Sequence, residues 1–161
     1  MILPIGSEPP PFISIILPTY NRARLVMRAI QSIQAQTFSD WELLIIDDGS
    51  RDGTYDFVTT EMNGDKRVRY HYATNRGLAM ARNIGLSMSR GNYFTFLDSD
   101  DEYLPDHLAI RAEYLRAHPE VELLHGGVEV IGSDMVADKH DPSKQISISE
   151  CMVGGTFFIR R

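Results

Sequence analysis

The sequence contains a single cysteine, Cys151, so no disulfide can form within the chain. It also lacks any run approaching the roughly 20 apolar residues that a membrane-spanning helix needs. Residues 1–12 are rich in proline and have neither a basic start nor a long apolar stretch, which argues against a signal peptide. A lone thiol fits a reducing compartment. We therefore expect a cytoplasmic protein, and leave open its peripheral attachment to the inner face of a membrane.

Positive charge is also scarce. The chain has 16 lysines and arginines against 22 aspartates and glutamates, which gives a net charge of −6. Nucleic acid is a poor expectation for such a chain, because phosphate backbones are bound by basic surfaces. A small phosphorylated ligand held by local groups is not excluded. No Gly-x-Gly-x-x-Gly motif follows the first apolar run, which argues against a dinucleotide-binding dehydrogenase.

What the sequence does have is the composition of one globular domain, residues 1–161, with 43% hydrophobic residues. Short apolar runs alternate with helical patterns along it. Strands are predicted over 13–17, 41–46, 68–72, 93–97, 121–130 and 156–159, helices over 22–36, 54–62, 78–88 and 105–118, and a polar loop over 132–149. This alternation favours an α/β domain with a largely parallel sheet, in which ligands bind at the carboxyl ends of the strands.

Polar residues follow three of the predicted strands. They form the sequences Pro18-Thr19-Tyr20-Asn21, Asp47-Asp48-Gly49-Ser50 and Asp98-Ser99-Asp100-Asp101. The carboxyl ends of parallel strands meet at one edge of a sheet, so these residues are expected to lie together. An ordinary surface loop would also be polar, but three acidic or asparagine-bearing turns on one edge are a more specific arrangement.

The pair Asp98 and Asp100 is the best candidate for a metal site. Two carboxylates at positions i and i+2 of an extended backbone project to the same side. Like charges that close repel unless a cation lies between them, and Mg²⁺ or Mn²⁺ prefers carboxylate oxygens. The alternative is a solvated acidic turn.

Asp48, Gly77 and Arg82 are candidate nucleotide contacts. The carboxylate of Asp48 can accept hydrogen bonds from a base or a ribose. Gly77 stands where a helix begins, so exposed N–H groups there can face a ligand. Arg82 can bind phosphates or pair with a carboxylate of the pocket. The alternatives are a simple strand-ending turn for Asp48 and a solvent-facing side chain for Arg82.

Taken in order, the motifs resemble those of family 2 glycosyltransferases. The resemblance runs from Ile13 to about Pro105, and Gly154 to Arg160 is similar to a strand further on in that family. The motifs that carry it are Pro18-Thr19-Tyr20-Asn21, Asp47-Asp48-Gly49-Ser50 with Asp52-Gly53-Thr54, Asn75-Arg76-Gly77 with Ala81-Arg82-Asn83, and Leu97-Asp98-Ser99-Asp100-Asp101.

The resemblance implies a GT-A fold, with a Rossmann-like, mainly parallel sheet flanked by helices. It implies an inverting transferase that moves a sugar from a nucleotide-diphosphate sugar, a UDP-sugar being favoured, to a hydroxyl of a carbohydrate or lipid-linked acceptor. The implied cofactor is Mn²⁺ or Mg²⁺, held by Asp100 and Asp98. The implied nucleotide-binding residues are Pro18, Thr19, Tyr20, Asn21, Asp48, Gly77, Arg82, Asp98 and Ser99.

The resemblance also implies that the general base is a carboxylate beyond the strand formed by Gly154 to Arg160. We therefore expect that the acceptor-side C-terminal part of the domain is missing after Arg161, and that the chain alone transfers sugar slowly or not at all. The catalytic residue is unidentified, and Glu129 and Glu150 are the reserve candidates.

Two other enzyme classes and a binding module without turnover are the alternative functions. A nucleotidyltransferase usually has a basic, glycine-rich loop after its first strand, where this chain has Pro18-Thr19-Tyr20-Asn21. A phosphatase-like domain would have a nucleophilic aspartate there, and none is present. A module that binds a nucleotide sugar without turnover stays open.

Overall fold

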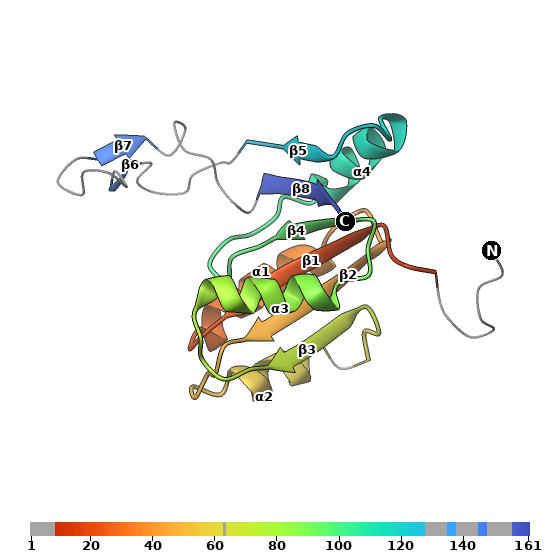
Figure 1. Ribbon diagram of the computed structural model, residues 1–161. Helices are drawn as coiled ribbons and strands as arrows, with labels where there is room; N and C mark the ends of the chain where they lie inside the picture. The colour runs from red at the N-terminus through yellow and green to blue at the C-terminus, as the bar shows by residue number, and fades with distance from the viewer. Residues whose placement is uncertain (1–8, 63, 128–134, 138–144, 148–155) are drawn as a thin grey trace.

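The computed structural model describes residues 9–62, 64–127, 135–137, 145–147 and 156–161. Its centre is a six-stranded sheet of order β3-β2-β1-β4-β8-β5 (Figure 1). Four neighbouring strands are parallel, and β8 pairs antiparallel with both β4 and β5. The strands are β1 (Ile13–Thr19), β2 (Trp41–Asp47), β3 (Val68–Tyr72), β4 (Tyr93–Phe96), β5 (Leu123–His125) and β8 (Phe157–Arg160).

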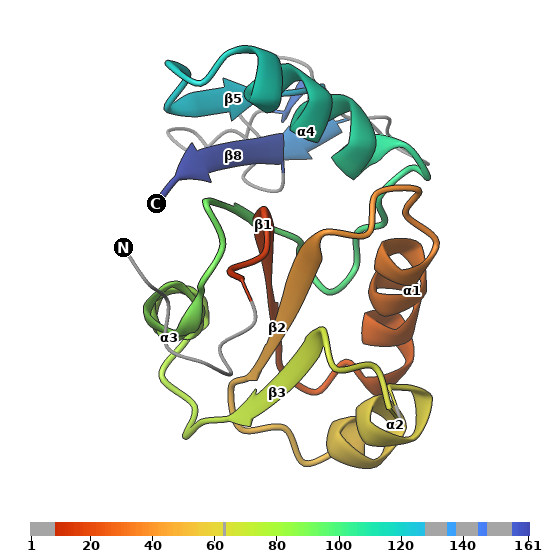
Figure 2. The same ribbon diagram turned by 90° about the vertical axis from the view of Figure 1, so that its right-hand side faces the viewer.

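Four helices cover the sheet. The helices α1 (Ala23–Gln34) and α2 (Thr54–Glu61) lie on one face, and α3 (Leu78–Met88) lies on the other (Figure 2). The fourth, α4 (His107–Ala117), contributes to the same core as α1 and α2 and lies beside β5 and β8. No helix in the described part of the chain is long and apolar enough to cross a membrane.

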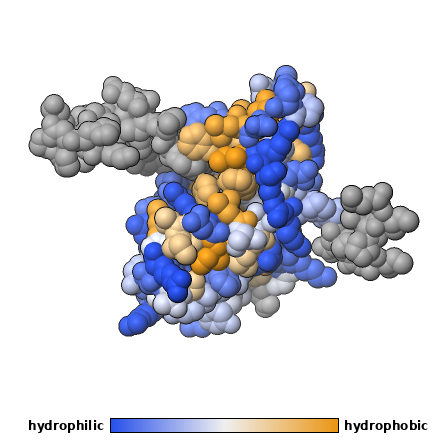
Figure 3. All heavy atoms as spheres, in the orientation of Figure 1, coloured by the Kyte–Doolittle hydropathy of each residue, from blue (hydrophilic) through white to orange (hydrophobic). Residues whose placement is uncertain are grey.

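Both faces of the central strands are buried, which explains their continuous apolar runs. All seven residues of β1 and all seven of β2 are buried. Alternate residues point to opposite faces, so Ile15 packs with α1 while Ile16 packs with α3. Helix α3 comes very close to β1: a Cβ added at Gly85 would lie 2.4 Å from Cγ2 of Ile16. Beyond α3, apolar residues gather over β4, β8 and β5 (Figure 3).

Most predicted elements are confirmed, and the differences have physical causes. The first strand was predicted to end before Pro18, but β1 continues to Thr19. Proline's missing N–H costs little there, because pairing with β4 ends at Ile16. The helix predicted from 105 begins at His107. In the predicted 132–149 loop, β6 (Met135–Ala137) and β7 (Gln145–Ser147) form an antiparallel pair, and the other positions lie outside the described residues.

Candidate functional site

The loops after β1 and β2 are joined by hydrogen bonds at the carboxyl edge of the sheet. The amide of Asn21 donates to Ser50 Oγ at 2.8 Å, and the amide of Arg51 donates to Asn21 Oδ1 at 2.8 Å. Asn21 has φ +50°, a left-handed conformation that asparagine tolerates better than most residues. Thr19 is buried, and its Oγ1 has no hydrogen-bond partner among the described residues. Tyr20 is 48% exposed at the rim.

Asp48 holds the loop that precedes α3. The residue is only 5% exposed, and its carboxylate accepts hydrogen bonds at 2.8 Å from the backbone amides of Arg76 and Gly77. Gly77 has φ +87°, which favours glycine, and it is the residue before α3. The two loops nearly touch, since a Cβ on Gly49 would lie 3.0 Å from the amide nitrogen of Asn75. Asp48 therefore positions the loop that precedes α3, a role that its sequence motif alone does not reveal.

Arg82 and Asp98 form an ion pair across the site. Nη2 of Arg82 lies 2.7 Å from Oδ1 of Asp98, and its guanidinium carbon lies 5.1 Å from the centre of the Phe96 ring. Nε of Arg82 is buried without a partner in the described part of the chain. Of the two alternatives for Arg82, the structure shows the carboxylate pair and not a free, solvent-facing side chain.

Asp98 and Asp100 lie in a turn, not on extended backbone. The amide of Asp101 donates to the carbonyl of Asp98 at 3.0 Å, which closes the turn. The premise that both carboxylates project from one strand is therefore wrong: Asp98 pairs with Arg82, while Asp100 pairs with Arg22. The turn still concentrates negative charge, since Asp98, Asp100 and Asp101 lie close together in it. Burial, and then the charges of Asp98 and Asp100, raise the pKa of Asp101. Ser99, in the same turn, is buried.

The carboxylates of this turn fit a divalent cation that is shared with a ligand. Within the described residues, no group of three or more histidine, cysteine, aspartate or glutamate side chains could hold a metal by itself. Mg²⁺ sites in phosphate-binding proteins commonly use only one or two carboxylates, and substrate phosphates complete the shell. Asp98 and Asp100 supply two such carboxylates, with side chains that are 36% and 49% exposed.

The sequence motifs did not reveal the structural roles of three residues of the site. Buried Asp47 accepts a hydrogen bond from the hydroxyl of Tyr70 and one of 2.7 Å from the amide of Ser50. Asp52 accepts from the amide of Ala23 at 3.0 Å and so joins the start of α1 to the loop before α2. Burial would raise the pKa of Asp52, but hydrogen bonds from Ala23 and Thr54 outweigh it and lower the pKa. Arg22, expected only as the start of a helix, supplies the cation beside Asp100.

Comparisons with known proteins identify the family of this chain. The sequence model of the family described as "Glycosyl transferase family 2" matches residues 14–142. The chain belongs to this family. An uncharacterized glycosyltransferase of Rickettsia felis is 42% identical over 103 residues, which are 64% of this chain and 17% of that protein. An uncharacterized glycosyltransferase of Haemophilus influenzae is 42% identical over 106 residues, which cover 65% of this chain and 42% of the relative.

A third family member has a more specific name. The Escherichia coli protein UDP-Glc:alpha-D-GlcNAc-diphosphoundecaprenol beta-1,3-glucosyltransferase WfgD is 31% identical over 143 residues, 87% of this chain and 54% of its own length. The chain thus spans from about a sixth to about half of the length of these three family 2 relatives.

Solved structures show the same GT-A fold. S. aureus TarS 1-349 in complex with UDP-GlcNAc has a TM-score of 0.71 and 23% identity, and covers 92% of this chain and 45% of that one. The mannosyltransferase PcManGT of Pyrobaculum calidifontis, in complex with GDP-Man and Mn²⁺, has a TM-score of 0.71 and 24% identity, and covers 99% of this chain and 48% of that one. The reserve base candidates Glu129 and Glu150 lie outside the described residues, as does Cys151.

Proposed function

We propose that this domain binds a UDP-sugar and, in the whole protein, transfers the sugar to an acceptor hydroxyl with inversion. The observation that carries the proposal is the assembly of three strand-end loops, in which Arg22 and Arg82 both lie on carboxylates of the acidic turn. A site with two arginines beside two aspartates has cations for a diphosphate and oxygens for a metal.

The nucleoside is assigned to the loops after β1 and β2. The base would lie near Pro18, Thr19, Tyr20 and Asn21, where the Thr19 hydroxyl is unpaired within the described structure. Asp48 would act at the base edge, directly or through the amides of Arg76 and Gly77 that it orients. Asp98 and Ser99 would lie at the ribose.

The diphosphate is assigned to the acidic turn and its two arginines. Asp100, with Asp98, would hold Mn²⁺ or Mg²⁺, which supplies charge neutralisation as the sugar–phosphate bond breaks. The guanidinium groups of Arg22 and Arg82 already lie at these carboxylates, so a phosphate bound there is within their reach. The acceptor hydroxyl would attack the anomeric carbon from the face opposite the diphosphate, with its proton taken by a carboxylate that is not assigned here.

The relatives support the kind of donor and acceptor. TarS forms complexes with UDP and with UDP-GlcNAc, and the E. coli relative is named for UDP-glucose and a diphosphoundecaprenol-linked acceptor. These names favour a UDP-sugar donor and a lipid-linked or carbohydrate acceptor for this chain. PcManGT binds GDP-Man on the same fold, so the base must be tested and not inferred from the fold. A cytoplasmic location remains a prediction.

Thermal unfolding with a panel of nucleotides tests the proposal, because a ligand that binds only the native state raises the melting temperature. UDP with Mn²⁺ is expected to give a larger rise than UDP with EDTA, GDP with Mn²⁺ or dTDP with Mn²⁺. Equal shifts with Mn²⁺ and EDTA would exclude the metal from binding, and a larger response to GDP or dTDP would exclude uridine as the preferred base. Binding with no transfer of labelled sugar by the whole protein would favour the non-enzymatic module instead.

A further inference from the structure

An open, arginine-lined cavity of about 720 Å³ lies at the end of the sheet opposite to the candidate donor site. It is placed where β1 and β4 begin and β8 ends (Figure 1), and the register pairs Tyr93 with Arg160 there. The seven residues of β1 separate this end from the donor loops by roughly 20 Å, at about 3.3 Å per residue. The lining contains no aspartate or glutamate but four arginines, which are Arg90, Arg116, Arg160 and Arg161. We call this the arginine cavity.

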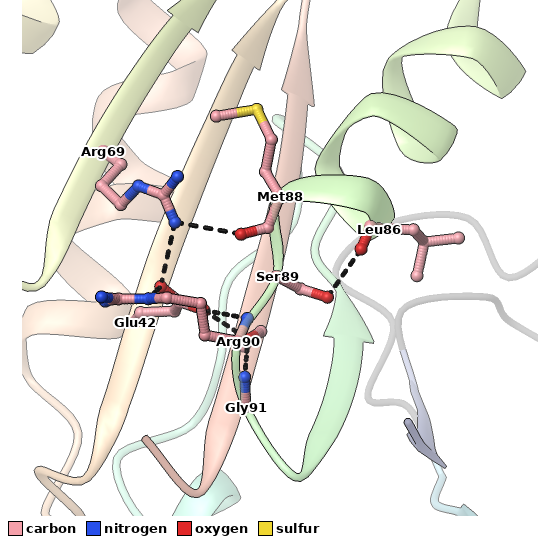
Figure 4. A network of polar contacts seen from close by, with 8 residues as sticks. Glu42, Arg69, Leu86, Met88, Ser89, Arg90 and Gly91 are labelled. Carbon is pink, nitrogen blue, oxygen red and sulfur yellow. Dashed lines mark hydrogen bonds and ion pairs between the residues drawn. The ribbon is translucent and has the colours of Figure 1, made fainter. Parts of the chain in front are cut away.

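Arg90 is held in place by a buried carboxylate. Glu42, on β2, is only 1% exposed and accepts from the amide of Arg90 at 2.6 Å and from its Nε at 3.0 Å (Figure 4). Burial would raise the pKa of Glu42, but hydrogen bonds from Ser14 and Arg90 lower it, so the carboxylate is charged. The terminal nitrogens of Arg90 have no hydrogen bond to the described residues, which leaves them available to a ligand.

Aromatic rings orient two more arginines. The guanidinium of Arg116 lies 4.8 Å from the centre of the Phe12 ring. That of Arg160 lies 5.7 Å from the Tyr93 ring and donates to the Tyr93 hydroxyl and the Val121 carbonyl, both at 3.1 Å. A guanidinium group that is already held in place loses less freedom when its planar fork of N–H donors binds the oxygens of an anion. The cavity is thus partly pre-organised for an anion.

The charges around the arginine cavity do not balance. Glu42 faces both Arg90 and Arg69, and Asp40 faces Arg116 at 3.5 Å. Neither Arg160 nor Arg161 has an acidic partner among the described residues. Four arginines line the cavity, and the only carboxylate side chains paired with them among the described residues are Glu42 and Asp40, in a chain whose net charge is −6. Figure 3 shows a band of hydrophilic residues on this side of the molecule.

Helix ends explain only part of this cluster. Arg116 is in the last turn of α4, where a cation is favoured by the helix dipole. Arg69 donates to the carbonyl of Met88, the last residue of α3. Arg160 lies on β8 and Arg161 follows it, so neither is part of a helix end. Their convergence on one cavity needs another reason.

We propose that the arginine cavity is a second anion site that binds a phosphate group. Arginine is suited to it because its fork of N–H donors matches phosphate oxygens. The phosphate belongs either to the headgroup of an anionic lipid or to a soluble phosphorylated compound. The site is separate from the donor loops, so it is independent of the donor chemistry proposed above.

The test uses Arg161→Glu, because the Arg161 side chain is exposed and makes no hydrogen bond or ion pair with the described residues. Lys66→Glu is the matched control: Lys66 is also exposed, undergoes the same charge reversal, and precedes β3 at the far edge of the sheet. Both variants are expected to keep the melting temperature and the Mn²⁺-dependent response to UDP of the unchanged protein.

In the first arm, pyrophosphate is titrated in EDTA and backbone amide shifts are followed by NMR. Saturable shifts at Gly91 and Asn92 are expected, with affinity reduced about ten-fold or more in Arg161→Glu, since a hydrogen bond to a charged group contributes about 1.5–3 kcal/mol. In the second arm, the protein is sedimented with phosphatidylcholine vesicles that do or do not contain phosphatidylglycerol. Binding only to the anionic vesicles, lost in Arg161→Glu and kept in Lys66→Glu, assigns the phosphate to a lipid.

The proposal is overturned if neither probe binds the unchanged protein, or if pyrophosphate shifts only amides of the donor loops. It is also overturned if Lys66→Glu weakens binding as much as Arg161→Glu, because that result would show a long-range charge effect without a defined site. Loss of the pyrophosphate response in Arg161→Glu alone, with no vesicle binding, supports the site and assigns it to a soluble phosphate.

Discussion

Asp48 gives the sharpest prediction about how the donor loops are built. Its buried carboxylate accepts two backbone amides, those of Arg76 and Gly77, each at 2.8 Å. Asp48→Asn keeps the size of the side chain but replaces one acceptor oxygen by an NH₂ group. That NH₂ would face a backbone N–H, and two donors cannot bond to each other.

The expected cost follows from these two bonds. A hydrogen bond to a charged group contributes about 1.5–3 kcal/mol, and a neutral one about half of that. Losing one bond and weakening the other should lower the free energy of unfolding by about 2 kcal/mol. For a chain of this size, that corresponds to a fall in melting temperature of about 4–8 °C.

Calorimetry of the ligand-free protein measures this effect, with Asp56→Asn as the control. Asp56 is exposed in the first turn of α2, so its variant should lose only about 0.3–1 kcal/mol. An unchanged melting temperature for Asp48→Asn would refute the structural role of this carboxylate. Ligand binding then separates two possible roles of Asp48. If Asp48 contacts the base, its variant should weaken UDP binding and leave the Mn²⁺-dependent part of pyrophosphate binding intact, whereas a displaced loop weakens both.

Three further perturbations test the helix packing, the acidic turn and the buried network. Gly85→Ala should lower the free energy of unfolding by about 1–3 kcal/mol, because the new Cβ would lie 2.4 Å from Cγ2 of Ile16. Arg22→Ala should raise Mn²⁺ affinity without nucleotide by up to about five-fold, because an exposed ion pair with Asp100 contributes about 0.2–1 kcal/mol and the cation no longer has to displace it. Glu42→Gln should make the free energy of unfolding fall less steeply as the pH is lowered. The pKa of Glu42 is lowered in the folded state, so its charged carboxylate stabilises the fold above the ordinary pKa of 4.5, and this stabilisation is lost as the pH falls through the lower, folded-state pKa.

Each of these has a control and a contradicting outcome. In chemical denaturation, the Gly85→Ala change should be milder in an Ile16→Ala background, and equal costs in both backgrounds would contradict the close contact. In calorimetric Mn²⁺ titration, Arg28→Ala is the control, since Arg28 pairs with Glu102 outside the proposed metal site; a similar gain in both variants would contradict a specific competition. In unfolding between pH 6 and pH 3, exposed Glu61→Gln should follow the unchanged protein, and an equally steep curve for Glu42→Gln would contradict the assigned pKa.

The sequence predicts the sheet well because burial and periodicity are local signals. The strands around Ile15 and Leu44 are apolar runs because both faces of the sheet are covered, and such runs are visible in the sequence. The helix around Ile30 is predicted by the helical spacing of residues that prove to be buried. Strand-end loops could be assigned to one edge because parallel strands share a direction. The fold and the approximate place of the candidate site therefore follow from short stretches of sequence.

What the sequence does not predict depends on contacts between distant residues. Arg22 and Asp100 are 78 residues apart, and Asp48 and Gly77 are 29 apart, so neither pairing is visible in a motif. The turn at Asp98 was predicted as extended backbone because it directly follows an apolar strand, whereas a hydrogen bond from the amide of Asp101 to the carbonyl of Asp98 closes it. The pair β6 and β7 was missed because each strand has only three residues, too few for a period to show.

Asp100 and its turn are proposed to bind a nucleoside diphosphate through a divalent cation. Calorimetric titration of UDP, with Mn²⁺ and with EDTA, tests this most directly in the unchanged protein and in Asp100→Asn. Mn²⁺ should raise UDP affinity at least about ten-fold in the unchanged protein, a difference of about 1.4 kcal/mol. Asp100→Asn should lose this gain while its melting temperature without ligand stays nearly the same, because relief of the repulsion within the acidic turn offsets the loss of the exposed ion pair with Arg22. An Asp100→Asn variant that binds UDP with Mn²⁺ as tightly as the unchanged protein would contradict the account.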